Sequence, residues 1–299
     1  MSHVIWSQWE DLVVPAGFTK LTPTSTPLDS ADLSAITFYV PQYMGGRKAL
    51  LHVPNMPSLQ YLQVPNAGFE DAVEFLRPGM VLCNARGVHD ASTAELAIGL
   101  AIAARRGFAQ FGADQINGQW NHKRYPSLND SKIGIVGAGS IAQTIGRYLA
   151  PYDVEVFYFS RSAKDGAKAI SEIDNYLPEL DIVILALPLN AESKDLFDAK
   201  RLGLMKDGST IVNVARGPII NTEALVDELN SGRLYAGLDV TDPEPLPAGH
   251  PLWSAKNCVI TPHVGGDSTA FESRGKRLVE EQLERLAARE ELINIVAVG

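Results

Sequence analysis

The sequence predicts an α/β protein whose larger domain is built on a doubly wound parallel sheet. From Lys132 onward, short and nearly continuous apolar runs alternate with helical stretches, as expected of parallel strands covered on both faces. The first run leads into a glycine turn, Gly137-Ala-Gly139-Ser-Ile-Ala142, that opens a helix. The predicted strands of this domain are Ile133–Val136, Val154–Phe159, Ile182–Leu187, Ile211–Val214, Tyr235–Val240 and Val259–Thr261.

The first ninety residues predict a second, smaller α/β domain. Short strands are expected at Ser34–Val40, Leu59–Pro65 and Met80–Asn84, each bounded by turn residues. A charged amphipathic helix at Phe271–Arg289 is expected to fold back onto this domain and make it discontinuous. The predicted division is therefore 1–91 with 268–299 for the smaller domain, and 92–267 for the larger.

A long helix is predicted to connect the two domains. Ser92-Thr-Ala-Glu95 has the pattern of a capping box, which predicts that the helix opens at Ser92. The helix is Ala-rich and apolar and is expected to end near Arg105-Arg106. The polar stretch 117–130 is predicted to cross the surface.

Composition excludes several classes of function. The chain has 299 residues, 45% apolar and 20% charged, with a net charge of −9, which argues against non-specific nucleic-acid binding. It has neither a leader pattern nor an apolar run of about 18 residues, so a cytoplasmic protein outside the membrane is expected. Cys83 and Cys258 are expected to be buried and reduced. No metal-ligand spacing and no G-x-S-x-G motif occur, so neither a metal site nor a serine hydrolase is expected.

The glycine turn predicts a dinucleotide-binding site. Gly137 permits the tight turn, Gly139 lets the backbone approach a pyrophosphate, and Ala142 allows close packing of helix on strand. The pyrophosphate is expected on the amides of Ser140 and Ile141 at the start of the helix. A bare tight turn is the alternative interpretation.

The end of the second strand predicts which dinucleotide is preferred. NAD-binding domains place an Asp or Glu there, for the ribose hydroxyls. Here the position eighteen residues after Ala142 is Ser160, followed by Arg161, Ser162 and then Lys164, with no carboxylate to repel a 2′-phosphate. A guanidinium suits phosphate, so NADP(H) is expected to be preferred and NAD(H) possible. A solvated basic turn is the alternative.

Three polar residues follow predicted strands and indicate hydride transfer to a 2-keto acid. Arg216 can hold the substrate carboxylate and keto oxygen in a fork, and His263 can protonate the carbonyl oxygen as hydride arrives. Glu244, in a proline-rich loop, can favour the charged form of the imidazole. A surface arginine and a structural histidine are the alternatives. For His89, a place lining the cleft between the domains and a capping or surface role are equally compatible with the sequence.

Taken together, these segments resemble the D-isomer-specific 2-hydroxyacid dehydrogenase family. The matching pieces occur in the family's order and span most of the chain beyond residue 59. They are NAGFED (66–71), NARGVHDASTAELAIG (84–99), IGIVGAGSIA (133–142), ALPLNAES (186–193), NVARGPIIN (213–221), GLDVTDPEPLP (237–247) and TPHVGG (261–266).

The resemblance implies a Rossmann coenzyme domain inserted into a discontinuous flavodoxin-like substrate domain, with catalysis in the cleft. It implies Arg216 as substrate-binding, His263 as acid/base with Glu244 as its partner, and the amides around Ala67 and Gly68 as holders of the substrate carboxylate. Homodimers formed through the coenzyme domains are usual for this family. Residues implied to flank the cofactor are Thr93, Leu187, Pro188, Ala215, Asp239 and Gly265.

Departures from the family pattern shape the predicted activity. Ser160 stands where NAD-using members have Asp, as in glyoxylate/hydroxypyruvate reductases, which favours an NADPH-dependent reductase of glyoxylate, hydroxypyruvate or a related 2-keto acid. Asp267-Ser268 follows Gly266, where small residues are commoner, and residues 1–58 match poorly. Phosphite oxidation within the same family uses a similar Arg/Glu/His trio, so it remains an alternative. A dinucleotide-sensing, corepressor-like protein is a further alternative. Formate oxidation is less favoured, because the trio suits keto-acid chemistry.

Overall fold

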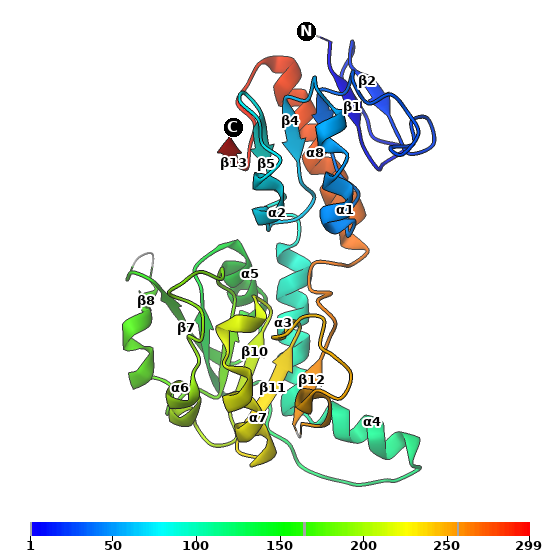
Figure 1. Ribbon diagram of the computed structural model, residues 1–299. Helices are drawn as coiled ribbons and strands as arrows, with labels where there is room; N and C mark the ends of the chain where they lie inside the picture. The colour runs from blue at the N-terminus through cyan, green and yellow to red at the C-terminus, as the bar shows by residue number, and fades with distance from the viewer. Residues whose placement is uncertain (1, 164–165, 256) are drawn as a thin grey trace. The chain divides into compact units, whose positions relative to one another are not determined.

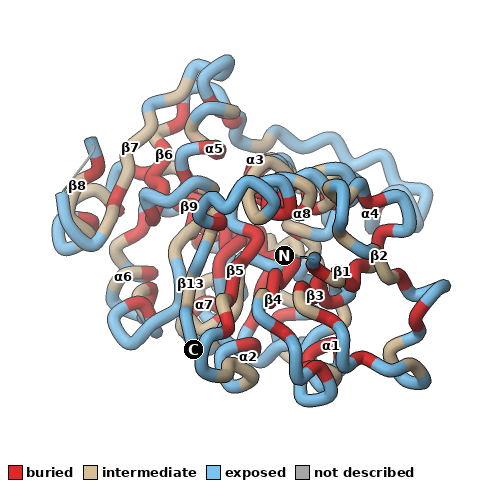
Figure 2. The backbone as a smooth tube through the Cα atoms, turned by 90° about the horizontal axis from the view of Figure 1, so that it is seen from above, coloured by how far each residue is buried: buried red, intermediate tan, exposed pale blue. Residues whose placement is uncertain are grey.

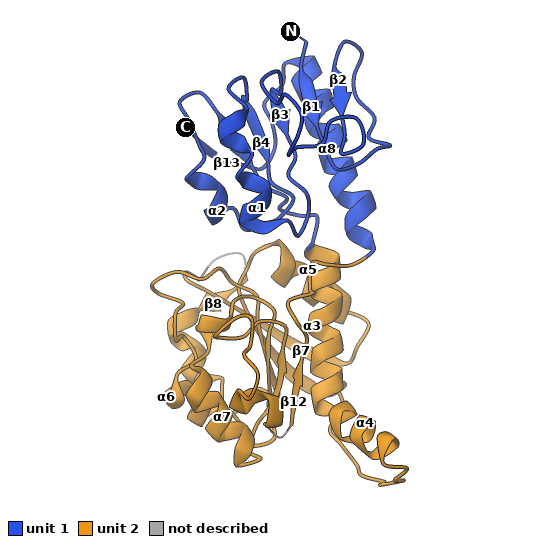
Figure 3. Cartoon of the chain, turned by 45° about the vertical axis from the view of Figure 1, so that its right-hand side comes forward, with its two compact units in different colours: residues 1–89, 269–299 blue, residues 90–268 orange. Residues whose placement is uncertain are grey.

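The computed structural model describes residues 2–163, 166–255 and 257–299 (Figure 1). The chain divides into two compact units (Figure 3). Unit 1 comprises residues 1–89 and 269–299, and unit 2 comprises residues 90–268. Within the described ranges, no helix is both long and apolar enough to cross a membrane.

Unit 2 contains a seven-stranded sheet in the order β12-β11-β10-β9-β6-β7-β8, with every pair parallel. The order reverses direction at β6, which makes the sheet doubly wound, as predicted. Its strands are β6 (Ser131–Val136), β7 (Val154–Ser160), β8 (Lys168–Ala169), β9 (Ile182–Leu185), β10 (Thr210–Asn213), β11 (Tyr235–Leu238) and β12 (Cys258–Ile260).

The carboxyl ends of the central strands are level with one another. Val136 of β6 pairs with Leu185 of β9, which pairs with Asn213 of β10, and Asn213 pairs with Leu238 of β11. Leu238 in turn pairs with Ile260 of β12. The loops that follow these strands therefore leave the sheet along one edge.

Both faces of this sheet are covered, which explains the continuous apolar runs. Ile182 and Ile184 pack in one core cluster with Ala97 and Ile145, while Val183 and Leu185 pack in another. Successive side chains of a strand point to opposite faces, so a strand buried on both sides has no polar alternation. The helices are α3 (Asp90–Arg105), α4 (Phe108–Ile116), α5 (Ser140–Leu149), α6 (Ala199–Leu204) and α7 (Thr222–Asn230), with short 3₁₀ turns η2 (Ile170–Asn175), η3 (Gly217–Ile219) and η4 (Pro251–Ser254).

The predicted capping box at Ser92 is wrong. Helix α3 begins at Asp90, so Ser92 lies inside its first turn. The Ser92 hydroxyl instead hydrogen-bonds to the hydroxyl of Ser268, with 2.6 Å between the oxygens. Asp90 places a carboxylate in the first turn, where the helix dipole favours negative charge.

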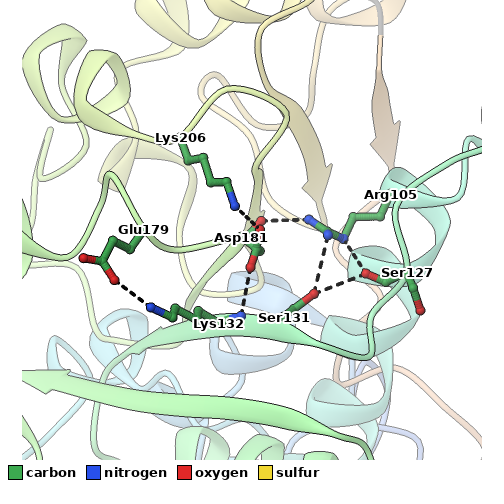
Figure 4. Close-up of polar contacts among 7 residues, drawn as sticks. All are labelled: Arg105, Ser127, Ser131, Lys132, Glu179, Asp181 and Lys206. Atoms are coloured by element: carbon green, nitrogen blue, oxygen red, sulfur yellow. Dashed lines mark hydrogen bonds and ion pairs between the residues drawn. The ribbon is translucent and has the colours of Figure 1, made fainter.

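A buried arginine at the end of α3 binds the chain where it enters β6 (Figure 4). The Arg105 guanidinium donates to the Ser127 carbonyl (3.1 Å), the Asp181 carbonyl (3.0 Å) and the Ser131 hydroxyl (3.4 Å). The arm between, residues 106–126, carries α4 and most of the predicted surface crossing at 117–130. Its base is thus fixed to the amino end of β6.

Unit 1 contains a six-stranded sheet in the order β13-β5-β4-β3-β1-β2. All pairs are parallel except the antiparallel pair of β13 with β5, which gives a flavodoxin-like sheet with one added edge strand. Strands β3, β4 and β5 are largely buried (Figure 2). The strands are β1 (Val4–Trp6), β2 (Thr19–Leu21), β3 (Phe38–Tyr39), β4 (Tyr61–Gln63), β5 (Val81–Cys83) and β13 (Ile295–Val298).

Helix α8 (Ala270–Ala288) explains why unit 1 is discontinuous in sequence. Its residues Phe271, Leu278 and Leu283 share a core cluster with Ile5 and Phe38 of the unit 1 sheet. The other core cluster of unit 1 lies with the short elements α1 (Gly46–Leu50), η1 (Val53–Asn55) and α2 (Glu70–Val73). Without the returning C-terminal segment, one face of this sheet would be uncovered.

Four strands were not predicted from the sequence: β1, β2, β8 and β13. Each has two to four residues, and β2, β8 and β13 lie at sheet edges where alternation is weak. The two cysteines are free thiols, as expected, with Cys83 buried and Cys258 partly buried. Burial raises the pKa of each thiol to about 12, so both stay protonated near neutral pH.

Candidate active site

The carboxyl edge of the unit 2 sheet brings His263 and Glu244 together. His263 Nδ1 lies 2.5 Å from Glu244 Oε1. A carboxylate only accepts, so Nδ1 carries the proton, and in the neutral ring Nε2 is the basic nitrogen. Both side chains remain partly exposed, at 47% for His263 and 38% for Glu244. The pair is thus accessible to a ligand.

A buried aspartate holds the loop that presents His263. Asp239, directly after β11, is 2% exposed. Its carboxylate accepts from the Thr261 hydroxyl (2.6 Å), the Val264 amide (2.9 Å) and the Gly265 amide (2.8 Å). Its carbonyl accepts from the His263 amide at 2.8 Å. The family resemblance implied a place near the cofactor for Asp239 but not this organising role.

Arg216 is exposed and follows β10 on a constrained loop. Asn213, the last residue of β10, accepts from the Ala215 amide (3.0 Å) and donates to the Arg216 carbonyl (2.9 Å). At Gly217, a Cβ would lie 1.9 Å from the Thr241 carbonyl oxygen, so only glycine fits. The loop is therefore pressed against the segment leading to Glu244. Among the described residues, no hydrogen bond or ion pair joins Arg216 to Glu244 or His263.

The glycine turn after β6 fits a dinucleotide pyrophosphate. Gly137 has φ of +128°, and a Cβ there would lie 2.1 Å from the Ala186 carbonyl oxygen. Gly139 precedes α5 in an extended conformation, and open space surrounds the position of a Cβ there. Ser140 is exposed and Ile141 partly exposed, so the first amides of α5 are available to an anion. Ala142 is fully buried, as the close packing of helix on strand requires.

The residues predicted to flank the cofactor follow the same row of strand ends, except Thr93, which lies in the first turn of α3. Thr93 lies close to Gly265: its methyl carbon would be 3.5 Å from a Cβ at that glycine. Leu187 and Pro188 follow β9, and the Pro188 carbonyl accepts from the Ser193 hydroxyl at 2.8 Å. Ala215, after β10, is buried. Leu187, Pro188 and Ala215 thus lie just after strands at the edge that carries the glycine turn.

The cation that follows β7, Arg161, has the carboxylate of Glu192 close to it. Ser160 is the last residue of β7 and donates to the Ser162 carbonyl at 2.6 Å. Arg161 is 82% exposed, and its Nη1 lies 4.0 Å from Glu192 Oε2. The sequence expectation that no carboxylate is available here is therefore wrong, because Glu192 comes from the loop after β9. Lys164 lies outside the described residues.

In unit 1, the turn of residues 65–68 follows β4. Ala67 is exposed and Gly68 partly exposed. His89 is buried, with its ring stacked against Phe271 at a centroid distance of 5.5 Å. Its Nε2 lies 2.8 Å from the Pro65 carbonyl oxygen, so this nitrogen donates. This contact joins residues far apart in sequence.

A doubly wound domain with this glycine turn and an imidazole–carboxylate pair at the same edge defines a nicotinamide-dependent oxidoreductase. The chain belongs to the D-isomer-specific 2-hydroxyacid dehydrogenase family, whose NAD-binding domain matches residues 98–265. The predicted family, the two-domain fold and the enzyme class are thereby confirmed. Members of this family carry out NAD(P)-linked oxidoreduction of hydroxy acids.

Individual relatives are similar along most of this chain. The glyoxylate reductase of Thermofilum pendens is 32% identical over 259 residues, which cover 81% of this chain and 72% of that protein. The mitochondrial formate dehydrogenase of Solanum tuberosum is 33% identical, over 69% of this chain and 58% of that protein. Among solved structures, the TT0316 protein of Thermus thermophilus is 27% identical, with a TM-score of 0.75, covering 99% of this chain and all of that one.

Proposed function

We propose that this enzyme is an NADPH-preferring reductase of a small 2-keto acid of the glyoxylate or hydroxypyruvate type. The observation that carries the proposal is the His263–Glu244 hydrogen bond at the sheet edge that also holds the glycine turn and Arg216. The similarity to the Thermofilum pendens glyoxylate reductase supports the substrate class.

The three polar residues take the roles that their chemistry allows. When bound, the reduced nicotinamide supplies the hydride that reaches the carbonyl carbon. Arg216 binds the carboxylate and keto oxygen of the substrate through its two-pronged guanidinium. His263 donates a proton from Nε2 to the carbonyl oxygen, which becomes the hydroxyl group. Glu244 accepts the hydrogen bond from Nδ1–H throughout the reaction. Its negative charge stabilises the imidazolium before the proton moves to the substrate.

The residues that would hold the cofactor fall into groups, according to the part of the dinucleotide that each would contact. The pyrophosphate would lie on Gly137, Gly139 and the amides of Ser140 and Ile141. The 2′-phosphate would lie on the end of β7, where Arg161 supplies the cation and Glu192 weakens it. The residues proposed for the 2′-phosphate are Ser160, Arg161 and Ser162, and those proposed to flank the nicotinamide half are Thr93, Leu187, Pro188, Ala215, Asp239 and Gly265.

We further propose that unit 1 is the substrate domain, with the amides of Ala67 and Gly68 as ligands of the substrate carboxylate. Both residues lie in a turn at the carboxyl end of β4, the edge at which ligands bind in open α/β sheets. Among the described residues, neither amide donates a hydrogen bond to another protein group. A substrate carboxylate would supply the missing acceptor.

A homodimer formed through the coenzyme domain is proposed on the basis of the arm after α3. Trp120 is 97% exposed and Ile116 87% exposed, although the base of the arm is fixed by Arg105. The arm also lines a hollow of about 590 Å³ with its own residues, Phe111 and Trp120 among them. A second copy would cover this apolar surface through the same segment. Light scattering should show a dimer that Trp120→Glu with Ile116→Glu converts to a monomer.

The experiment that tests the activity follows oxidation of NADPH or NADH with glyoxylate, hydroxypyruvate, pyruvate and a bulkier aryl keto acid. Fast NADPH-dependent turnover of a small keto acid is expected. Reduction of NADP⁺ or NAD⁺ by formate or phosphite, without keto-acid turnover, would reassign the substrate. Tight dinucleotide binding without any turnover would favour a sensor.

A further inference from the structure

The three successive carbonyls of the turn 65–68 are each fixed by a hydrogen bond from unit 1. In order along the chain they accept from His89 Nε2 (2.8 Å), the Ala85 amide (2.8 Å) and Asn84 Nδ2 (2.6 Å). Two of the three donors are side chains, and both belong to buried residues. Neither side chain is among the groups already assigned to proton transfer or substrate binding.

Fixing these carbonyls also fixes the direction of the amides. In a planar trans peptide, the C=O of one residue and the N–H of the next point in opposite directions. The amides of Asn66, Ala67 and Gly68 therefore face away from His89, Ala85 and Asn84. Consecutive amides that point to one side form a concavity suited to an anion. The turn is held in this arrangement before any ligand arrives.

The Asn84 side chain is itself held at both ends. Its Oδ1 accepts from the Arg86 amide at 3.3 Å, which fixes the orientation of the carboxamide. The Asn84 carbonyl accepts from Gln63 Nε2 at 3.0 Å, and Gln63 Oε1 accepts from Gln282 Nε2 of α8 at 2.9 Å. Gln63 is 1% exposed and Gln282 is fully buried. A satisfied buried polar chain is rigid, because each broken link leaves an unpaired group.

The His89 donor is held by packing. Its ring lies 5.5 Å from the ring of Tyr43 and 5.5 Å from that of Phe271, and the His89 and Phe271 rings are 2° from parallel. The imidazole therefore cannot rotate away from the turn without leaving the stack. A phenyl ring at this position would keep the stack and lose the donor.

We propose that Asn84 and His89 are positioning residues for the substrate carboxylate. They set the direction of the turn amides and do not touch the substrate. The proposal rests on the function proposed above, in which those amides hold the carboxylate. It assigns a part in substrate binding to two residues that lie beneath the turn rather than on its open side.

The test compares variants that remove a donor with variants that do not. His89→Phe and Asn84→Ala should each raise the KM for glyoxylate about tenfold, with kcat and the KM for NADPH unchanged. His89→Gln, which restores an amide donor in place of the imidazole, should recover most of the lost affinity. Tyr39→Phe is the matched control, because it removes a buried hydrogen bond to the Ala49 carbonyl elsewhere in unit 1.

Calorimetric titration of oxalate into the NADP⁺-loaded enzyme provides a readout without turnover. Weaker oxalate binding in His89→Phe and Asn84→Ala, with normal binding in Tyr39→Phe and His89→Gln, is the expected pattern. Equal weakening in Tyr39→Phe would show general loosening of unit 1 and overturn the proposal, as would unchanged binding in all variants. If the wild type reduces no keto acid, the proposed function fails, while the titration still tests the turn.

Discussion

The carboxyl edges of the two sheets are organised by the same device but present different chemistry. In unit 2, Asp239 and Asn213 lie at or just beyond a strand end and tie down the loops that carry His263 and Arg216. In unit 1, Asn84 does the same for a turn that offers only backbone amides. At both edges, buried polar groups hold the loops or turns that carry the exposed groups.

The difference between the edges lies in charge. Unit 2 uses a buried carboxylate with three neighbouring donors, and both of its oxygens accept hydrogen bonds that hold the loop. Unit 1 uses the N–H donors of His89, Ala85 and Asn84, which place no negative charge near an incoming carboxylate. On the function proposed above, the anion-binding turn is organised by N–H donors that carry no negative charge, and the proton-transfer site has a buried carboxylate behind it.

The largest effect is expected from a substitution that removes a reacting group of unit 2 and leaves unit 1 unchanged. His263→Ala should lower kcat by about 10³-fold, because it removes the general acid, while the Kd for NADPH stays unchanged. Steady-state kinetics and fluorescence titration of NADPH measure the two quantities. An unchanged kcat would remove His263 from the reacting groups.

Glu244→Gln should reduce kcat by about tenfold to a hundredfold and move the alkaline limb of the pH–rate profile to lower pH. The amide keeps the shape of the side chain but no longer stabilises the protonated ring. The pH dependence of kcat/KM measures the displacement. A profile that stays in place would show that Glu244 only orients the ring.

The charge of the organising residue is tested by Asp239→Asn. The carboxamide cannot accept from both the Val264 and Gly265 amides, so the free energy of unfolding should fall by about 2 kcal/mol. Urea unfolding measures this loss, and Tyr39→Phe in unit 1 serves as the comparison. A loss no larger than that of the control would argue against a special role for the buried charge.

The preference for NADPH over NADH is expected to change less than the rates and stability above when Arg161 is replaced. Arg161→Asp should lower kcat/KM for NADPH about thirtyfold relative to NADH, because it replaces a phosphate-binding cation with a repelling anion. Parallel assays with the two cofactors give the ratio. Equal losses with both cofactors would indicate a merely solvated basic turn.

The smallest expected effect is an increase in the preference for NADPH, opposite to the effect of Arg161→Asp. Glu192→Gln should raise the NADPH-to-NADH ratio about threefold, because Arg161 no longer faces a carboxylate. The effect should shrink in high salt, which screens exposed charges. A lower ratio would mean that Glu192 favours rather than opposes the 2′-phosphate.

The sequence by itself determined the features that are encoded within short stretches of the chain. Apolar runs of strand length, the glycine turn at 137–142 and the motifs around Arg216, Glu244 and His263 are each contained within about ten residues, so periodicity and spacing reveal them. Those motifs also sufficed for the family. The extent of α8 could be predicted for the same reason.

Only the tertiary structure decided which distant groups meet. Glu192 reaches Arg161, Gln282 reaches Gln63, and Ser92 pairs with Ser268 rather than capping α3. These contacts depend on strand order, on register and on the return of the C-terminal helix to unit 1, none of which a local pattern encodes. A hydrogen bond is a matter of a few ångströms between atoms, and the chain sets that distance only once both sheets have formed.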